Sequence, residues 1–251
     1  MARQYWRPSN MLYPLPAVMV SCADEEGRSN IMTAAWTGTI CSDPVMVSVS
    51  IRPERYSHDI IARTGEFVIN LTTEELTYAA DFCGVRSGRD VDKFEYLHLT
   101  KVPSRCVGAP SIGESPVCLE CVVTAVEKLG THDMFIAKVV QVSVDEQYLD
   151  EKGRLALEDA GLVAYVHGVY LSLGEKLGTF GFSVRKKGGA KKTGITKPAK
   201  KKPDKGKAAA KQTAAERPDK RKAAAKQSIS GMSEKRKAFR LQVKKSPAEK
   251  R

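Results

Sequence analysis

The segment Val45-Met46-Val47-Ser48-Val49-Ser50-Ile51-Arg52 carries the clearest fold signal in this chain. Successive side chains of an extended strand point to opposite faces. The four β-branched aliphatic residues therefore fall on one face, and the methionine, two serines and arginine fall on the other. The segment predicts a strand whose apolar face builds a core and whose second face is conspicuously polar.

Further strand signals lie on both sides of this segment. Apolar runs bounded by turn residues predict strands at 17–23, 67–71, 117–129 and 134–144. The short, turn-rich loop Gly130–Asp133 joins the last two strands as a hairpin.

Helical signals are fewer and shorter. Ser57 is a candidate cap for a helix that ends near Gly65. Thr72 and Glu75 have capping-box spacing and predict a second helix running toward Gly84. A mainly β chain with short helices favours a closed or partly closed antiparallel barrel, which removes exposed strand edges.

Charge divides the chain into two unlike parts. Residues 185–251 hold 25 of the 41 Lys and Arg but only 5 of the 29 Asp and Glu, which leaves residues 1–184 net acidic. The first part is rich in apolar residues and is predicted to be one domain with its own core. The second part is Lys/Ala-rich, repeats the segment 203–213 at 218–228, and is predicted to be a disordered basic tail. Such a tail favours non-specific contact with nucleic acid or another polyanion; steering of acidic partners is the alternative.

The six cysteines are scattered without a secretion signal, which indicates reduced thiols and a cytoplasmic protein. No apolar run is long enough for a membrane span. Cys118 and Cys121 have metal-site spacing, but residues three apart on a strand face opposite ways. We therefore expect both thiols to be structural and predict no metal site.

Two segments are candidates for ligand binding. The first, 29–37 (SNIMTAAWT), places small side chains beside hydroxyl, amide and indole groups, so that a flat ligand could approach the backbone. The second, 52–57 (RPERYS), places two arginines and a serine at a helix start, where free amides and the helix dipole favour a phosphate. An ordinarily packed strand and a solvated turn remain the alternative interpretations.

Together these segments resemble the flavin reductase-like, FMN-binding split-barrel family, and within it most nearly the flavoredoxins. The resemblance covers roughly residues 8–183 and rests on the order and spacing of several motifs. These motifs lie at 30–36, 43–52, 55–57, 65–70, 90–94, 119–121 and 132–136.

The resemblance implies a Greek-key split β-barrel, a homodimer and bound FMN, with no catalytic residue because the flavin carries the redox step. It also implies a set of cofactor-binding residues. These are Asn30, Met32, Thr33, Ala34, Ala35, Trp36, Ser48, Val49, Ser50, Arg55, Ser57, Lys93, His132 and Tyr165. Lys93 would supply a point charge for the phosphate or the reduced ring, and His132 a hydrogen bond.

The function implied is an oxidoreductase of the flavin reductase type that passes electrons from NAD(P)H or a redox protein to an acceptor. One departure keeps an alternative open. Relatives that use a diffusible nicotinamide often carry a Gly-Asp-His triplet on a late strand, whereas this chain has 165–170 (YVHGVY) there. A flavoredoxin-like electron carrier is therefore the second interpretation. The glycines of 173–182 are expected to let the last barrel segment pass close to its neighbour.

Overall fold

The computed structural model describes residues 3–185, of which those up to Ser183 belong to one compact unit. The predicted disordered tail falls outside the described residues, apart from Arg185. The strands are β1 (Leu15–Pro16), β2 (Val18–Ala23), β3 (Ser29–Ala34), β4 (Thr37–Ser42), β5 (Val45–Ile51), β6 (Glu66–Leu71), β7 (Lys101–Val102), β8 (Ser111–Ile112), β9 (Val117–Lys128), β10 (Asp133–Val144), β11 (Val163–Val166) and β12 (Val169–Ser172). The helices are α1 (Tyr56–Thr64), α2 (Thr77–Val85) and α3 (Lys93–Tyr96), with 3-10 turns η1 (Glu146–Tyr148), η2 (Leu157–Asp159) and η3 (Phe182–Val184).

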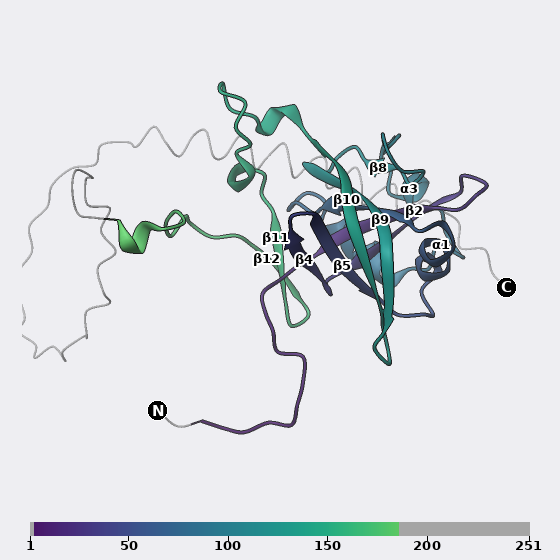
Figure 1. Cartoon of the computed structure of the whole chain (residues 1–251), viewed down its shortest axis with the longest axis horizontal. Helices are drawn as coiled ribbons and strands as arrows, with labels where there is room; N and C mark the ends of the chain where they lie inside the picture. The colour runs from purple at the N-terminus through teal and green to yellow at the C-terminus, as the bar shows by residue number, and fades with distance from the viewer. Residues whose placement is uncertain (1–2, 186–251) are drawn as a thin grey trace, which may run out of the picture. The chain divides into compact units, whose positions relative to one another are not determined.

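Seven strands form one antiparallel sheet in the order β3-β2-β6-β9-β10-β5-β4 (Figure 1). Strand β3 also contacts β5, so the sheet curls back toward itself. Two register shifts along β10, after Ile136 and after Val139, accompany the curvature of this long strand. A smaller sheet, β1-β11-β12, stands apart from the large one, and β7 pairs with β8.

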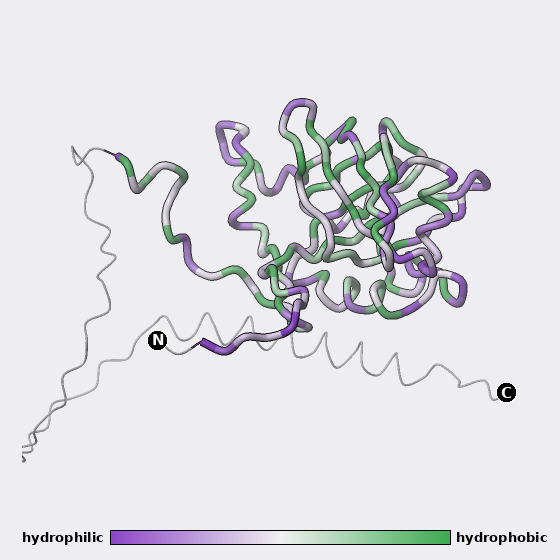
Figure 2. The backbone as a smooth tube through the Cα atoms, turned by 60° about the horizontal axis from the view of Figure 1, so that its bottom comes forward, coloured by the Kyte–Doolittle hydropathy of each residue, from purple (hydrophilic) through white to green (hydrophobic). Residues whose placement is uncertain are grey.

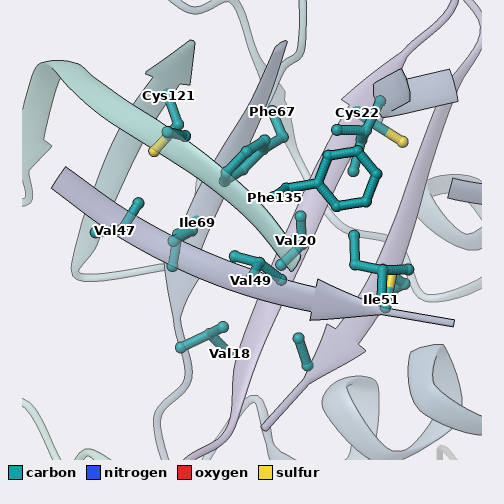
Figure 3. Close-up of a cluster of buried hydrophobic side chains, with 14 of the residues drawn as sticks. Val18, Val20, Cys22, Val47, Val49, Ile51, Phe67, Ile69, Cys121 and Phe135 are labelled. Carbon is teal, nitrogen blue, oxygen red and sulfur yellow. The ribbon is translucent and has the colours of Figure 1, made fainter. Parts of the chain in front are cut away.

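The core lies inside the curled sheet. The alternating residues Val47, Val49 and Ile51 of β5 face inward, as their pattern predicts, and pack with the fully buried rings of Phe67 and Phe135 (Figure 3). Hydrophobic segments gather in the strands, whereas several connecting loops are hydrophilic (Figure 2). The predicted mainly β fold and the 117–144 hairpin are confirmed.

Both helix starts differ from the prediction. Helix α1 begins at Tyr56 with Arg55 as the N-cap residue, and Ser57 does not cap it. The left-handed stop at Gly65 (φ 69°) is as predicted. Helix α2 begins at Thr77 rather than after Thr72, because a turn comes first in which the Leu76 amide donates to the Thr73 hydroxyl (3.4 Å).

The glycine-bearing stretch 173–181 forms no strand, which corrects the expectation that it belongs to the barrel. Leu173, Leu177 and Phe180 are exposed there, so the described unit offers them no neighbouring strand. Among residues 3–185, no helix combines the length and apolar character that crossing a bilayer requires.

Candidate functional site

A pocket of about 370 Å³ opens where the turn between β3 and β4 meets the end of β5, helix α2 and the β11–β12 hairpin. This volume is within the range of small-molecule sites. Nine of the sequence-predicted residues line it: Met32, Thr33, Ala34, Ala35, Trp36, Ser50, Arg55, His132 and Tyr165. The structure therefore brings together residues that are separated by more than a hundred positions in the chain.

Aromatic rings form one side of this pocket. The rings of Trp36 and His132 are nearly parallel, with centroids 6.5 Å apart and an interplanar angle of 15°. His132 lies in the turn between β9 and β10, which is closed by the Leu129 amide donating to the His132 carbonyl (2.9 Å). Ala34 and Ala35 add little bulk beside Trp36, so a planar ligand has room against the backbone.

A second cavity of about 150 Å³ adjoins the first and shares Thr33 and Arg55 with it. Three cations line it, Arg55, Lys93 and, from the loop after α2, Arg86, against one carboxylate, Glu54. Ser57 adds a hydroxyl, so the cavity is polar with an excess of positive charge. The first turn of α1 opens beside it, and backbone amides in a first turn lack intrahelical acceptors. Positive side chains, free amides and the helix dipole make this an environment for an anion.

The wall of the basic cavity is tightly fitted. Asn30 is buried and its side-chain amide donates to the Ser57 hydroxyl (2.8 Å). Ser57 is the second residue of α1 and not its N-cap, so its hydroxyl is available to orient Asn30. Gly88 lies against Asn30 and Tyr56, and a Cβ there would overlap the Asn30 side chain and lie 2.7 Å from the Tyr56 ring. Only glycine fits that position.

Lys93 is the most unusual group in the basic cavity, because its side chain is buried while its ammonium has no acidic partner. The residue is 3% exposed, and Nζ donates to the carbonyls of Ile31 (2.6 Å) and Cys83 (3.0 Å). Within residues 3–185, no carboxylate forms an ion pair with it. Burial lowers the pKa of Lys93, with Arg55 as a further cause. An anion in this cavity would offset that cost.

Two predicted residues lie outside both cavities. The Val49 side chain is buried in the core, because alternation along β5 turns it away from the face that carries Ser50. Ser48 shares that face but lines a third hollow, of about 480 Å³, between Trp36 and the N-terminal segment 9–13.

Several lining residues were missed by the sequence analysis. They are chiefly Asp81 and Gly84 of α2, Arg86, Ser87 and Gly88 of the following loop, and Tyr170 of β12. The run 86–89 (RSGR) combines two basic residues with two small ones after a predicted helix. It was the one sequence signal that could have indicated an anion-binding loop here. Asp81 and Tyr170 had none, because only the tertiary fold places them at the pocket.

The cysteine pair has the expected structural character. Cys118 and Cys121 are buried and belong to different clusters of core residues. Burial raises the pKa of Cys121 to about 12. Among the described residues, no group of His, Cys, Asp and Glu is arranged to hold a metal ion.

The chain is similar in fold and in sequence to known flavin-related proteins. The structure is similar to flavoredoxin of Desulfovibrio vulgaris (Miyazaki F), with a TM-score of 0.69, 31% identity, and coverage of 73% of this chain and 100% of that one. It also resembles a putative flavin reductase with a split barrel domain from Shewanella frigidimarina (TM-score 0.61, 24% identity, 68% and 87% coverage), a likeness that concerns the fold. The sequence is 25% identical to an NADH:riboflavin 5′-phosphate oxidoreductase of Streptomyces pristinaespiralis over 51% of this chain and 69% of that protein.

The curled antiparallel sheet, together with the likeness to these solved structures, places this protein in the class of split β-barrels. A family model described as "Flavin reductase like domain" matches residues 10–173. The chain therefore belongs to the flavin reductase-like family, and this membership supports a flavin-related oxidoreductase.

Proposed function

We propose that this chain is an FMN-dependent oxidoreductase of the flavin reductase type. The flavin ring would occupy the aromatic-walled cavity and the phosphate the adjoining basic cavity. The observation that carries the proposal is the buried, acid-free ammonium of Lys93 next to a cavity walled by Trp36 and His132. The likeness to an enzyme named for its action on riboflavin 5′-phosphate, which is FMN, supports the same cofactor.

The residues present fit a phosphorylated ligand. Lys93, Arg55 and the first amides of α1 offer donors for a phosphate, and charge-assisted hydrogen bonds of this kind are the strong ones. Asn30 and Ser57 are joined by a hydrogen bond, and Gly88 lets the loop after α2 pass close to Asn30. The site is therefore preorganised around an anion of limited size.

Of the two adjoining cavities, the one of about 370 Å³ is called the larger cavity. Its residues would bind and tune the ring. Trp36 and His132 offer flat surfaces, and Ala34 and Ala35 leave the backbone approachable. When bound, FMN would supply redox chemistry, including acceptance of a hydride, that none of the side chains lining the cavity offers. Positive charge on Lys93 would stabilise negative charge that accumulates nearby, and His132 would offer a hydrogen bond. Both residues should therefore affect affinity or potential rather than transfer a proton.

The electron donor of this proposal is NAD(P)H or a redox protein. The likeness to an enzyme named as an NADH oxidoreductase favours the nicotinamide. The second candidate is an electron carrier that does not oxidise NAD(P)H directly. It is favoured by the 31% identity to a flavoredoxin and by residues 165–170 (YVHGVY), which stand where relatives that use a diffusible nicotinamide often carry Gly-Asp-His.

We also propose that two copies of the chain associate. Exposed apolar side chains gather on neighbouring strands β4, β5 and β10 of the large sheet; they are Ile40, Val45, Val140, Val142 and Val144. A second copy is the partner that the family resemblance implies for these exposed side chains. Gel filtration with light scattering would test it, and a monomer at micromolar concentration would exclude it.

Stopped-flow mixing separates the two functional candidates. FMN-loaded full-length protein is mixed with NADH and, separately, with NADPH, while the absorbance of the oxidised flavin is followed. Rapid bleaching by either nucleotide supports the oxidoreductase. Bleaching by dithionite but by neither nucleotide supports the carrier, and failure to load with FMN contradicts both.

A further inference from the structure

The small sheet β1-β11-β12 forms a separate wall of the larger cavity. Tyr165 and Tyr170 lie opposite each other in the β11–β12 register, their rings meet edge to face with centroids 5.6 Å apart, and both line the cavity. The hairpin turns through His167 and Gly168, both of which have positive φ (47° and 91°). In Figure 1, β11 and β12 form a narrow hairpin outside the seven-stranded sheet.

The β11–β12 hairpin is held along its β11 edge by β1, where Leu15 pairs with Tyr165 and Pro16 with Ala164. Two further hydrogen-bonded attachments lie elsewhere on it. At the base of the hairpin, the Val163 amide donates to the Thr72 carbonyl (3.2 Å). Beside it, the Glu74 amide donates to the Gly161 carbonyl (2.8 Å). At the cavity, the Tyr170 hydroxyl donates to Oδ1 of Asp81 on α2 (3.3 Å). In the described part of the chain, this is the one side-chain hydrogen bond made by β11 or β12.

The hydroxyl of Tyr170 is set up to remain a donor. Burial and the neighbouring Asp81 carboxylate raise the pKa of Tyr170 to about 12, so the phenol stays protonated throughout the neutral range. Asp81 itself is exposed, so its carboxylate also presents a negative charge at the cavity. The contact therefore both fastens the hairpin to α2 and places a negative charge at that point.

We propose that the Asp81–Tyr170 hydrogen bond restricts access to the larger cavity and so determines which second reactant reaches a bound flavin. Small uncharged reactants pass the fastened hairpin, whereas a bulky anionic dinucleotide must displace it and approach the Asp81 carboxylate. Tyr170 is thus a specificity-determining residue. This inference rests on the proposed function, because the cavity is taken to hold the flavin ring.

Two hydride donors of matched chemistry provide the test. NADH is a large anion, whereas N-benzyl-1,4-dihydronicotinamide is small and neutral. Each gives up one hydride (two electrons and one proton) to the oxidised flavin and leaves as its pyridinium form, so the ratio of their second-order rate constants reports access. Stopped-flow rates are measured on FMN-loaded full-length protein and on the variants Tyr170→Phe, Asp81→Ala and Asp81→Asn.

We expect Tyr170→Phe and Asp81→Ala each to raise the NADH rate at least threefold relative to the small donor. The double variant should add little, because both changes remove the same contact. Asp81→Asn keeps an acceptor for the Tyr170 hydroxyl but removes the charge, and its effect should shrink as salt is added. Tyr148→Phe, which removes a phenol from η1, is the matched control and should leave the ratio unchanged.

Hydrogen exchange of the FMN-free chain gives a readout that does not depend on the flavin. Faster exchange in Tyr170→Phe, confined to residues 163–172, is expected if the contact fastens the hairpin. An unchanged donor ratio in both Tyr170→Phe and Asp81→Ala overturns the proposal, whatever the exchange shows. An inability of the wild-type chain to bind FMN overturns the proposed function instead, and FMN titration of the same samples identifies that case.

Discussion

Replacing Lys93 with methionine should weaken binding of FMN far more than binding of riboflavin, which lacks the phosphate. Lys93 is 3% exposed, donates to two carbonyls, and has no carboxylate partner among the described residues, so a phosphate would be the counter-ion of a desolvated charge. A hydrogen bond to a charged group contributes about 1.5–3 kcal/mol. With 1.4 kcal/mol per tenfold change, the Kd for FMN should rise about 10- to 150-fold.

The assay is an equilibrium titration of flavin fluorescence at fixed salt, run with both ligands on the wild type and the variant. Lys101→Met is the matched control, because Lys101 is also a lysine beside α3, ion-paired to Asp92 and outside both cavities. Riboflavin affinity should change little in either variant. Equal losses for FMN and riboflavin, or no loss for FMN, would refute the assignment of Lys93 to the phosphate.

The role assigned to Lys93 also predicts that FMN affinity depends on pH. Burial lowers the pKa of Lys93 in the FMN-free chain, so raising the pH through that lowered pKa removes the positive charge and weakens FMN binding. Bound phosphate favours the ammonium and therefore shifts the pKa upward. Lys93→Met should lack this alkaline loss of affinity, and a variant that retains the wild-type pH profile would count against the mechanism.

Three further predictions concern other parts of the chain. Gly88→Ala should lower FMN affinity because the added methyl overlaps Asn30, and an unchanged titration curve would show that the loop adapts. Iodoacetamide at pH 8 should label exposed Cys106 but not Cys121, whose pKa burial raises to about 12; mass spectrometry of the native protein decides, and rapid labelling of Cys121 would contradict its burial. Deleting residues 185–251 should abolish salt-sensitive retention on heparin and leave FMN binding intact. Loss of FMN from the truncated chain would show that the tail is needed for cofactor binding.

Local sequence patterns predicted the strands and turns that are determined by residues close together in the chain. The alternation at 45–52 and the hairpin around Gly130 were predicted correctly because a half-buried strand and a tight turn each leave a local signature. The short strands β1 and β11 were not predicted, since their pairing joins segments 150 residues apart, as in Leu15 opposite Tyr165. The order of the strands in the sheet could likewise not be predicted from the periodicity of apolar residues.

The candidate site was predictable in part, for the same reason. The runs around Trp36 and Arg55 carry recognisable chemistry, and the structure places them in adjoining cavities. The burial of Lys93 has no sequence signature, because the two carbonyls that hold its ammonium come from β3 and α2. Val49 was assigned to the site by resemblance, whereas alternation along β5 already indicated a core position.

The most direct test of the central claim is a titration of the full-length chain with FMN, followed by tryptophan fluorescence. The chain has only two tryptophans, so Trp6→Phe leaves Trp36, in the wall of the larger cavity, as the sole reporter. We predict saturable quenching of Trp36 at micromolar FMN, with a stoichiometry of one flavin per chain. Trp36 fluorescence that remains unchanged through the same titration, together with no flavin absorbance after dialysis, would contradict it.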